Sequence, residues 1–300
     1  MIREATLDDA AAVARLSTLV YPAELATERG LRHWWSSMPA RARRRMWAAE
    51  DDGELVGFAA ALLSPTSADA GAAIANAYVH PERRRRGVGA ALWDAVEGHL
   101  ARIRARHVNS FGLDEEPSRR FMGARGFEVT YVQRMSRLDL STLGPPPAPP
   151  AGVELVPYTS LDDPRLVYEL EVEALRDVPV DQPFDDVRWD DWFERWWRNP
   201  ELDAESSLLA LVSGEPAAFT TLVSDAESGR ATSGMTGTAR RFRGRGLALL
   251  VKHHALARAA ARGIAEATTE NDEQNVPMLK VNERLGYRPT AANATFTRRS

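Results

Sequence analysis

Hydrophobic and polar positions follow the same order twice along the chain, once in each half. Each half begins with a short apolar run typical of a strand, at residues 2–5 and 155–158, and continues with two helical stretches, the second of which is rich in tryptophan. Three strand-like runs come next in each half: ARRRMWAAE, LVGFAAALL and AAIANAYV, then SSLLALVS, PAAFTTLVS and TSGMTGT. A helix, a further strand, a short helix and closing strands complete each half. This order predicts an α/β (α+β) fold in which each half is a mixed, mostly antiparallel sheet flanked by helices.

The two halves also share four local landmarks at nearly constant spacing. They are Thr6-Leu7-Asp8-Asp9 with Ser160-Leu161-Asp162-Asp163, Asp52-Gly53-Glu54 with Ser213-Gly214-Glu215, Arg84-Arg85-Arg86-Gly87-Val88-Gly89 with Arg243-Gly244-Arg245-Gly246-Leu247-Ala248, and Gly126-Phe127 with Gly286-Tyr287. A stretch with five prolines, TLGPPPAPPAGVE, lies between the halves and favours extended backbone. We therefore predict an N-terminal domain at 1–142, a proline-rich linker at 143–152 and a C-terminal domain at 153–300.

Composition narrows the class of protein. With 44% hydrophobic and 27% charged residues, the chain of 300 residues suits a soluble globular protein. The net charge of -4 argues against a broad nucleic-acid surface, because such proteins need a surplus of positive charge. There is no cysteine, and no leader-like or membrane-spanning apolar stretch. We expect a cytoplasmic protein with no membrane or nucleic-acid partner.

One basic segment stands out against this acidic background: PERRRRGVGAALWDAVEGHL, residues 81–100, in which a glycine turn leads into a helix. A helix that begins at such a turn directs backbone N–H groups and the positive end of its dipole at one point, which suits a phosphate. The second half repeats the arrangement at Arg243 to Ala248. The phosphate loop of ATP-cleaving enzymes is absent, and a dinucleotide fold would place this turn after the first strand. We therefore predict two local phosphate sites.

These turns resemble the Arg/Gln-x-x-Gly-x-Gly/Ala signature of the GNAT acyltransferase superfamily, which binds the pyrophosphate of acetyl-coenzyme A. The first turn matches it at Arg84 to Gly89 and the second at Arg243 to Ala248. A register that begins at Arg241 and continues to Gly246 also fits the bare pattern, but Arg243 follows Thr238 by the same five residues that separate Arg84 from Val79, which favours Arg243. The closing stretch, from Thr269-Glu270-Asn271 to Gly286-Tyr287, is similar to the second domain of tandem actinobacterial-type GNAT proteins, a group that includes mycothiol synthase. The resemblance covers nearly the whole chain.

The resemblance implies acetyl-coenzyme A as co-substrate and a strand that splays from its neighbour before each turn, at Ala75–Val79 and Ser233–Thr238. In the first half it implies coenzyme contacts at Ala77, Tyr78, Val79, Arg84, Arg85, Arg86, Gly87, Val88 and Gly89. In the second half it implies them at Thr236, Gly237, Thr238, Arg243, Gly244, Arg245, Gly246, Leu247, Ala248, Asn271, Asn275 and Asn282.

The implied activity is N-acetyltransferase chemistry, in which an amine of a small molecule attacks the thioester directly. The tyrosine that serves as acid in many family members is replaced by Met122 in the first half and Asn282 in the second, and the family's helix-capping asparagine is Glu115 in the first half and Asn275 in the second. We therefore expect both halves to hold coenzyme A and the second half to carry the chemistry.

The candidate catalytic residues of the second half are Glu270 as base and Asn282 as hydrogen-bond donor. Asp272 and Glu273 lie behind Glu270, and the simpler interpretation of these three carboxylates is a solvated loop. We expect His253 and His254 to be packing or surface residues, and no histidine pair has the spacing of a metal site.

The resemblance implies that the helical region from Leu161 to Glu205 borders the acceptor site. Fifteen acidic residues and five arginines are interleaved there with tryptophans. This composition predicts a cationic or polyamine-like acceptor. The alternative is an acidic solvated helix face whose tryptophans fill the core or the contact between halves, where the arginines from 41 to 45 could meet it. A further alternative is a non-catalytic coenzyme-binding module that serves as sensor or scaffold. The chain could be a monomer with an internal pseudo-dimer, or a homodimer.

Overall fold

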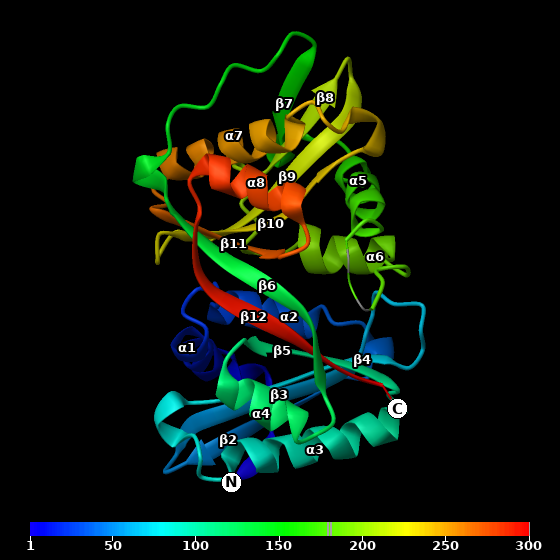
Figure 1. Cartoon of the computed structure of the whole chain (residues 1–300), viewed down its shortest axis with the longest axis vertical. Coiled ribbons are helices and arrows are strands. Elements are labelled where there is room, and N and C mark those ends of the chain that lie inside the picture. The colour runs from blue at the N-terminus through cyan, green and yellow to red at the C-terminus, as the bar shows by residue number, and fades with distance from the viewer. Residues whose placement is uncertain (179, 181, 300) are drawn as a thin grey trace. The chain divides into compact units, whose positions relative to one another are not determined.

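The computed structural model describes all residues except 179, 181 and 300. The chain divides into two compact units. Unit 1 contains Met1–Gln133, Val180–Arg195 and Ala291–Ser300, and unit 2 contains Arg134–Pro179 and Trp196–Thr290. These units differ from the contiguous domains 1–142 and 153–300 in two ways. Residues 180–195 belong to unit 1, and β6 (Glu128–Asp139) and β12 (Arg288–Arg299), both labelled in Figure 1, each have residues in both units. Equivalent strands of a repeat can complete either sheet, which is the physical basis of such an exchange.

In unit 1, strands β1 to β4 are antiparallel and β5 joins β4 in parallel. The bounds are Ile2–Glu4 (β1), Arg45–Asp51 (β2), Glu54–Leu63 (β3), Ala72–Val79 (β4) and His107–Leu113 (β5). On the other side of β5, β12 pairs antiparallel from Asn293 opposite Leu113 to Arg299 opposite His107. The sheet of the first repeat therefore receives the last strand of the second.

Helices cover both faces of this sheet. They are α1 (Ala10–Val20), α2 (Glu28–Ser36), α3 (Val88–Ile103) and α4 (Glu116–Gly123). Unit 1 also contains α6 (Trp189–Trp192), which the chain continues as a π-helical turn at Phe193–Trp197. Because successive strand residues point to opposite faces, neighbours on β3 contact different helices. A Cβ on Gly57 would lie 2.9 Å from Leu92 of α3, whereas Phe58 stacks on Trp35 of α2 with ring centroids 5.5 Å apart.

Unit 2 repeats this arrangement. Its strands are β7 (Val153–Pro157), β8 (Leu208–Val212), β9 (Glu215–Asp225), β10 (Arg230–Thr238) and β11 (Glu266–Asp272), with β10 and β11 parallel and the earlier pairs antiparallel. Its helices are α5 (Arg165–Leu175), α7 (Leu247–Ala261) and α8 (Val276–Leu285). Short 3-10 turns in the chain are at Leu7–Asp9, Ala40–Ala42, Pro81–Arg83, Leu140–Thr142, Tyr158–Ser160 and Arg240–Phe242.

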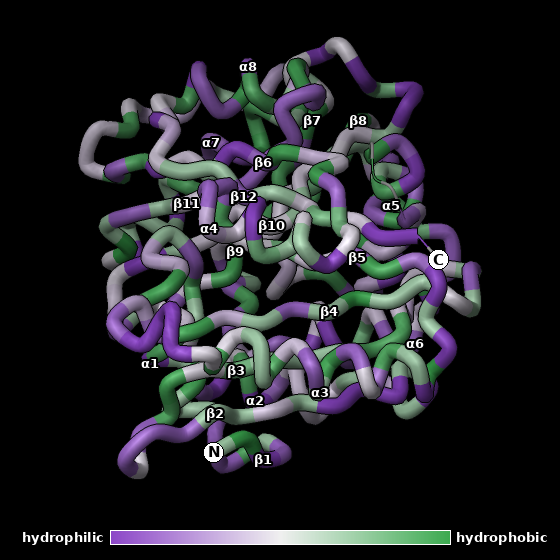
Figure 2. The backbone as a smooth tube through the Cα atoms, turned by 60° about the horizontal axis from the view of Figure 1, so that its bottom comes forward, coloured by the Kyte–Doolittle hydropathy of each residue, from purple (hydrophilic) through white to green (hydrophobic). Residues whose placement is uncertain are grey.

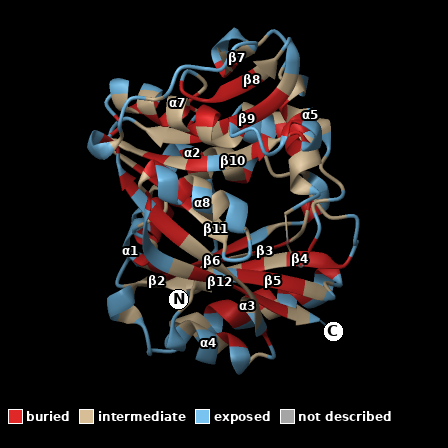
Figure 3. Ribbon diagram, turned by 45° about the horizontal axis from the view of Figure 1, so that its top comes forward, coloured by how far each residue is buried: buried red, intermediate tan, exposed pale blue. Residues whose placement is uncertain are grey.

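The cores explain why these residues form these elements. Buried residues, red in Figure 3, concentrate in the strands, and apolar stretches such as β3 appear green in Figure 2. In unit 1, Leu92, Val96 and Leu100 of α3 are buried at helical spacing, as the pattern predicts, and burial of each stabilises the fold by about 1.5–3 kcal/mol. In unit 2, Leu256 of α7 packs with Leu222 in the same way.

Residues 143–152, the segment that the sequence predicts as a linker, form neither helix nor strand. His253 and His254 of α7 bond to its backbone through Nε2, which lies 2.8 Å from the carbonyl oxygens of Gly144 and Pro147 respectively. The two histidines therefore hold the linker against the helix. Among the described residues, no helix is long and apolar enough to cross a membrane.

Candidate functional site

In each unit, two parallel strands separate before the arginine-glycine turn. β4 pairs with β5 only from Ala72 to Ile74, although its pairing with β3 continues to Val79. Likewise β10 pairs with β11 only as far as Ser233, opposite Thr269, while its pairing with β9 continues to Thr238 after an irregularity. Both strands thus open a split. In unit 1 it covers the predicted range Ala75–Val79, and in unit 2 it begins after Ser233, one residue later than the predicted range Ser233–Thr238.

The backbone of these strands offers hydrogen-bonding groups to the splits. His80 N–H donates to Val56 of β3 at 2.8 Å, and Ala239 N–H donates to Ala217 of β9 at 2.8 Å. Since backbone groups of adjacent strand residues point to opposite sides, the N–H groups of Val79 and Thr238 face away from these partners, toward the splits. Both residues belong to the predicted coenzyme contacts.

The two turns have the same backbone conformation. Arg85 and Gly87 have positive φ values of 64° and 84°, and their counterparts Gly244 and Gly246 have 77° and 76°. Alternation of left-handed residues directs successive N–H groups to one concave side, which is a known anion-binding geometry. In the described part of the chain, no protein acceptor bonds the N–H groups of residues 85–90 or 244–249. The amides at the starts of α3 and α7 are therefore available to an anion.

An arginine folds back over each turn. Arg84 Nε lies 3.3 Å from the carbonyl oxygen of Val79, and Arg243 Nε lies 3.1 Å from that of Thr238. The same bond five residues back confirms that Arg243, and not Arg241, is the counterpart of Arg84. Arg241 instead pairs with Glu215 at 2.8 Å.

The environments of the two arginines differ. Asp177, just after α5, receives bonds of 2.5 Å from both Arg243 and Arg240. These bonds hold the pKa of the Asp177 carboxyl well below its usual range. For Arg84, the structure shows no carboxylate partner in the described residues. The turn of unit 2 thus carries a carboxylate that competes with any phosphate for Arg243.

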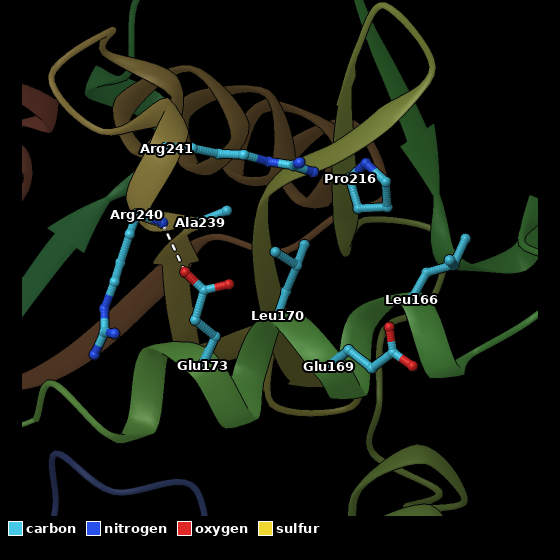
Figure 4. Close-up of a pocket in the computed structure, with 8 residues that line it drawn as sticks. All are labelled: Leu166, Glu169, Leu170, Glu173, Pro216, Ala239, Arg240 and Arg241. Carbon is cyan, nitrogen blue, oxygen red and sulfur yellow. Dashed lines mark hydrogen bonds between the residues drawn. The ribbon is translucent and has the colours of Figure 1, made fainter.

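A pocket of about 430 Å³ lies beside the turn of unit 2 (Figure 4). Glu169 and Glu173 enter it from α5, and the Glu173 carboxylate accepts a bond of 2.7 Å from the backbone N–H of Arg240. The lining residues are Leu166, Glu169, Leu170, Glu173, Pro216, Ala239, Arg240 and Arg241. Neither the glycines of the turn nor the residues at the end of β11 belong to it, so the pocket is separate from the split.

The end of β11 places the candidate catalytic residues at the split. Thr269 is the last residue of β11 that pairs with β10, so that Glu270 and Asn271 are the first two beyond the pairing. By strand alternation, the Asn271 side chain shares a face with that of Thr269, and the Glu270 side chain points to the opposite face. Glu270 is half-buried.

Asn282 of α8 contacts β11 on the face that carries the Asn271 side chain. Its Nδ2 donates to Asn271 Oδ1 at 2.5 Å, and its side chain is buried. Behind Glu270, the other two carboxylates have structural partners: Asp272 accepts from the backbone N–H of Gln274 at 2.6 Å, and Glu273 pairs with Arg134 at 3.5 Å. The solvated-loop interpretation therefore fits these two carboxylates.

Sequence reasoning missed Lys252 of α7, which lies behind Asn282. Its side chain is 1% exposed, and its Nζ donates to Asn282 Oδ1 at 2.7 Å and to Thr269 Oγ1 at 3.3 Å. Burial lowers the pKa of Lys252 to about 7. One signal was present: the chain holds 38 lysines and arginines, of which only Lys252 and Lys280 are lysines.

Unit 1 has apolar residues at the equivalent positions. Trp93 stands where unit 2 has Lys252, and Met122 where it has Asn282, and both are buried. The split of unit 1 is also bridged, because Asn76 Oδ1 accepts a bond of 2.8 Å from the backbone N–H of Phe111 on β5.

The helix caps differ as expected. Asn275 caps α8 by accepting from Met278 N–H at 3.3 Å, whereas Glu115 makes no side-chain cap at α4.

The acidic region from Leu161 to Glu205 contributes to both units. Arg41 bonds to Asp191, as the charges suggest, but both residues belong to unit 1, so that the expected contact across the domain interface is instead a contact within one unit. Trp192 is 2% exposed and stacks on Trp189, with ring centroids 5.7 Å apart. At these two tryptophans, packing accounts for the aromatic side chains.

Comparison with known proteins gives a consistent result. The family model for the acetyltransferase (GNAT) family matches residues 11–127 and 165–287, and each match contains one arginine-glycine turn. A mycothiol acetyltransferase of Clavibacter michiganensis subsp. michiganensis is 31% identical to the chain over 232 residues, which cover 75% of this chain and 72% of that protein.

Two solved structures share the fold over the whole chain. A GCN5-related N-acetyltransferase from Sphaerobacter thermophilus is similar with a TM-score of 0.76 and 21% identity, over 100% of this chain and 95% of that one. A tandem GNAT protein from the clavulanic acid biosynthesis pathway is similar with a TM-score of 0.74 and 22% identity, over 100% and 98%. With two family matches, two repeats of one fold and a curated relative, the chain belongs to the acetyltransferase (GNAT) family and has a tandem arrangement of GNAT folds.

Proposed function

We propose that the chain transfers an acetyl group from acetyl-coenzyme A to an amine of a small molecule, and that unit 2 carries out the transfer. This proposal rests on a combination of features at the split of unit 2. Unbonded amides of residues 244–249 and Arg243 suit a pyrophosphate, and polar side chains lie where β11 leaves β10. In this proposal the turn holds the coenzyme and the split receives its pantetheine and thioester.

The differences between the units support the choice of unit 2. At the end of β11 and on α8, unit 2 has Asn271, Asn275 and Asn282, all able to hydrogen-bond a ligand or a neighbouring backbone. Unit 1 has Met122 in place of Asn282, and methionine can donate no hydrogen bond. Asn76 also bridges the split of unit 1. We propose that unit 1 holds coenzyme A at its turn without transfer.

The proposed reaction is a direct attack. The acceptor amine loses a proton to Glu270, directly or through water, and its nitrogen forms a bond to the thioester carbonyl carbon. The Thr238 N–H, which faces the split, stabilises the negative charge on the carbonyl oxygen. The carbon–sulfur bond then breaks, Asn282 stabilises the departing thiolate as a hydrogen-bond donor, and the thiolate takes a proton from water, because an amide is not an acid.

We propose a cationic acceptor on the basis of charge. The Glu270 side chain points to the face of β11 opposite Asn271, so that an acceptor can approach from the α5 side while the coenzyme lies on the other. Carboxylates of α5 such as Glu169 add negative charge to that side of unit 2. Asp177 does not count toward this charge, because it already binds two arginines.

Free thiol release from acetyl-coenzyme A, measured with a panel of amines that includes polyamines and neutral amines, tests this function. We expect release above the water background with at least one amine, and faster release with cationic amines. Calorimetry with coenzyme A on the same preparation separates the alternatives. Binding without release for any amine would identify a non-catalytic module, and absence of both would contradict the proposed function altogether.

A further inference from the structure

The buried amine of Lys252 is the least expected feature of unit 2. A fully buried lysine is costly unless it is paired, and in the described part of the chain no carboxylate pairs with it. The groups that face the amine are Thr269 from β11, Asn282 from α8 and the ring of Tyr287, whose centroid lies 5.1 Å from Nζ. On α7 itself, His253 and His254 are directed to the linker.

The fold does not require this lysine. The equivalent position in unit 1 holds Trp93, which is 1% exposed, beside an equally apolar Met122. The same architecture is thus built with an apolar pair in one unit and with a charged and a polar residue in the other. A stability cost that the sister unit avoids indicates a role outside folding.

The hydrogen bonds of Lys252 have a direction. A protonated amine only donates, so that Asn282 must turn its oxygen toward Nζ, which it does at 2.7 Å. This orientation turns Asn282 Nδ2 toward Asn271, whose Oδ1 accepts at 2.5 Å. The Asn271 oxygen also accepts from Thr269 Oγ1 at 3.5 Å, so that the Asn271 amide nitrogen is on the other side of its side chain. A chain of donors therefore starts at Lys252 and ends at the split.

We propose that Lys252 is a positioning residue of unit 2, whose buried ammonium orients the side-chain amides of Asn282 and Asn271 so that they present N–H donors to the coenzyme at the β10–β11 split. A neutral amine has a lone pair and can accept from Asn282, which would permit both amides to reverse and present oxygens instead. The donor chain is then lost. This inference rests on the proposed function, because it assigns the coenzyme to unit 2.

The lowered pKa of Lys252, about 7, places this change of state within the working range of pH. Donors face the split below that pH, and the orientation is no longer fixed above it. As pH rises through about 7, we expect the rate of transfer to fall, because the oriented amide donors are lost. This fall adds to any change that the ionisation of the acceptor amine causes.

Three variants separate positioning from mere packing. Lys252→Met removes the donor at similar length, Lys252→Gln keeps an uncharged donor that does not titrate, and Lys280→Met changes the other lysine, which is exposed on α8. We expect kcat to fall about 10-fold or more in Lys252→Met with a smaller change in the KM for acetyl-coenzyme A. Lys252→Gln should recover part of kcat without the pH dependence near 7, and Lys280→Met should behave as the wild type. Unchanged kcat and an unchanged pH profile in Lys252→Met would overturn the proposal.

A second measurement does not need turnover. With only two lysines in the chain, carbon-13 labelling of lysine gives two Cε signals, and the signal of Lys252 is identified by its loss in Lys252→Met. We expect this signal to titrate near pH 7 and to shift when coenzyme A is added to the wild type but not to Gly246→Val. A signal that responds neither to pH in this range nor to coenzyme A would overturn the assignment. Failure of thiol release with a responsive signal would instead overturn transfer while the positioning of a bound coenzyme stands.

Discussion

The side chain of Arg243 donates from Nε to the carbonyl oxygen of Thr238, five residues earlier, at 3.1 Å. This bond ties the guanidinium to the end of the splayed strand, beside the unbonded amides of the turn. Asp177 holds the other side of the same guanidinium at 2.5 Å. Arg243 is therefore positioned for a phosphate but already shared with a carboxylate, and its affinity for the ligand depends on this competition.

Replacement of Asp177 by asparagine should increase the affinity for coenzyme A several-fold, because Arg243 and Arg240 lose a competing anion. Arg243→Ala should lower the affinity about 10-fold or more, the effect of one lost charge-assisted bond. Calorimetric titration measures both. Glu173→Gln is a matched control on α5, since Glu173 bonds to the Arg240 backbone and not to Arg243. Weaker binding in Asp177→Asn would show that Asp177 orients the arginine and does not compete for it.

The repeat predicts that exchanging the residues at equivalent positions of the two turns has unequal effects on stability. Arg85 has a φ of 64°, which L-residues adopt at a cost of roughly 1–2 kcal/mol, whereas its counterpart Gly244 adopts 77° without that cost. Gly244→Arg should lower the free energy of unfolding by about 1 kcal/mol, and Arg85→Gly should raise it or leave it unchanged, since glycine also stabilises the unfolded chain. Urea denaturation tests both. A stabilising Gly244→Arg would contradict the common backbone geometry.

The depressed pKa of Lys252 predicts how stability depends on pH. Its pKa of about 7 in the folded chain lies below the ordinary lysine pKa of 10.5, so that between these pH values the unfolded chain holds a proton that the folded chain has released. The free energy of unfolding should therefore rise with pH in this window, by roughly 1 kcal/mol per unit from this group, and should be lowest below pH 7.

Lys252→Met should remove this contribution and be more stable than the wild type at about pH 6, by several kcal/mol, with the difference shrinking as pH rises toward 10. Lys280→Met controls for the loss of a lysine as such. Denaturation curves at a series of pH values provide the measurement. Parallel pH dependence in wild type and Lys252→Met would mean that Lys252 keeps its proton when the chain folds.

Asn275 tests the capping of α8. Its side chain accepts from Met278 N–H at 3.3 Å, and loss of such a cap typically costs about 1 kcal/mol. Asn275→Ala should lower the free energy of unfolding by that amount. Glu115→Ala, at the equivalent position of α4, should have a smaller effect because Glu115 makes no cap. Equal losses in both variants would argue against a capping role that is specific to Asn275.

Much of the fold could be predicted from the sequence, since its patterns are local. The predicted strand AAIANAYV has the same bounds as β4. The spacing of Leu92, Val96 and Leu100 correctly predicts the buried face of α3. The position of Arg243 followed from a count of five residues. In these places the period of the pattern and the turn residues specify the backbone.

The features that could not be predicted are those that depend on contacts between elements far apart in the sequence. The pattern of residues 288–299 gives a strand, but nothing in it says that residues 293–299 pair with β5 of the first repeat. Likewise, nothing in the pattern of residues 180–195 predicts that they belong to unit 1 and not to the second repeat. The burial of Lys252 could not be predicted, because a single lysine in an apolar helix forms no recognisable sequence motif. Lys252 is buried only because β11 and α8 pack against α7.

The most direct test compares thiol release from acetyl-coenzyme A by Gly87→Val and Gly246→Val, with an amine that the wild type accepts. Both glycines have positive φ and open space around a Cβ, so that valine strains each turn in the same way. We expect Gly246→Val to lose release and Gly87→Val to keep it. Loss in Gly87→Val alone, or full release by Gly246→Val, would contradict transfer in unit 2.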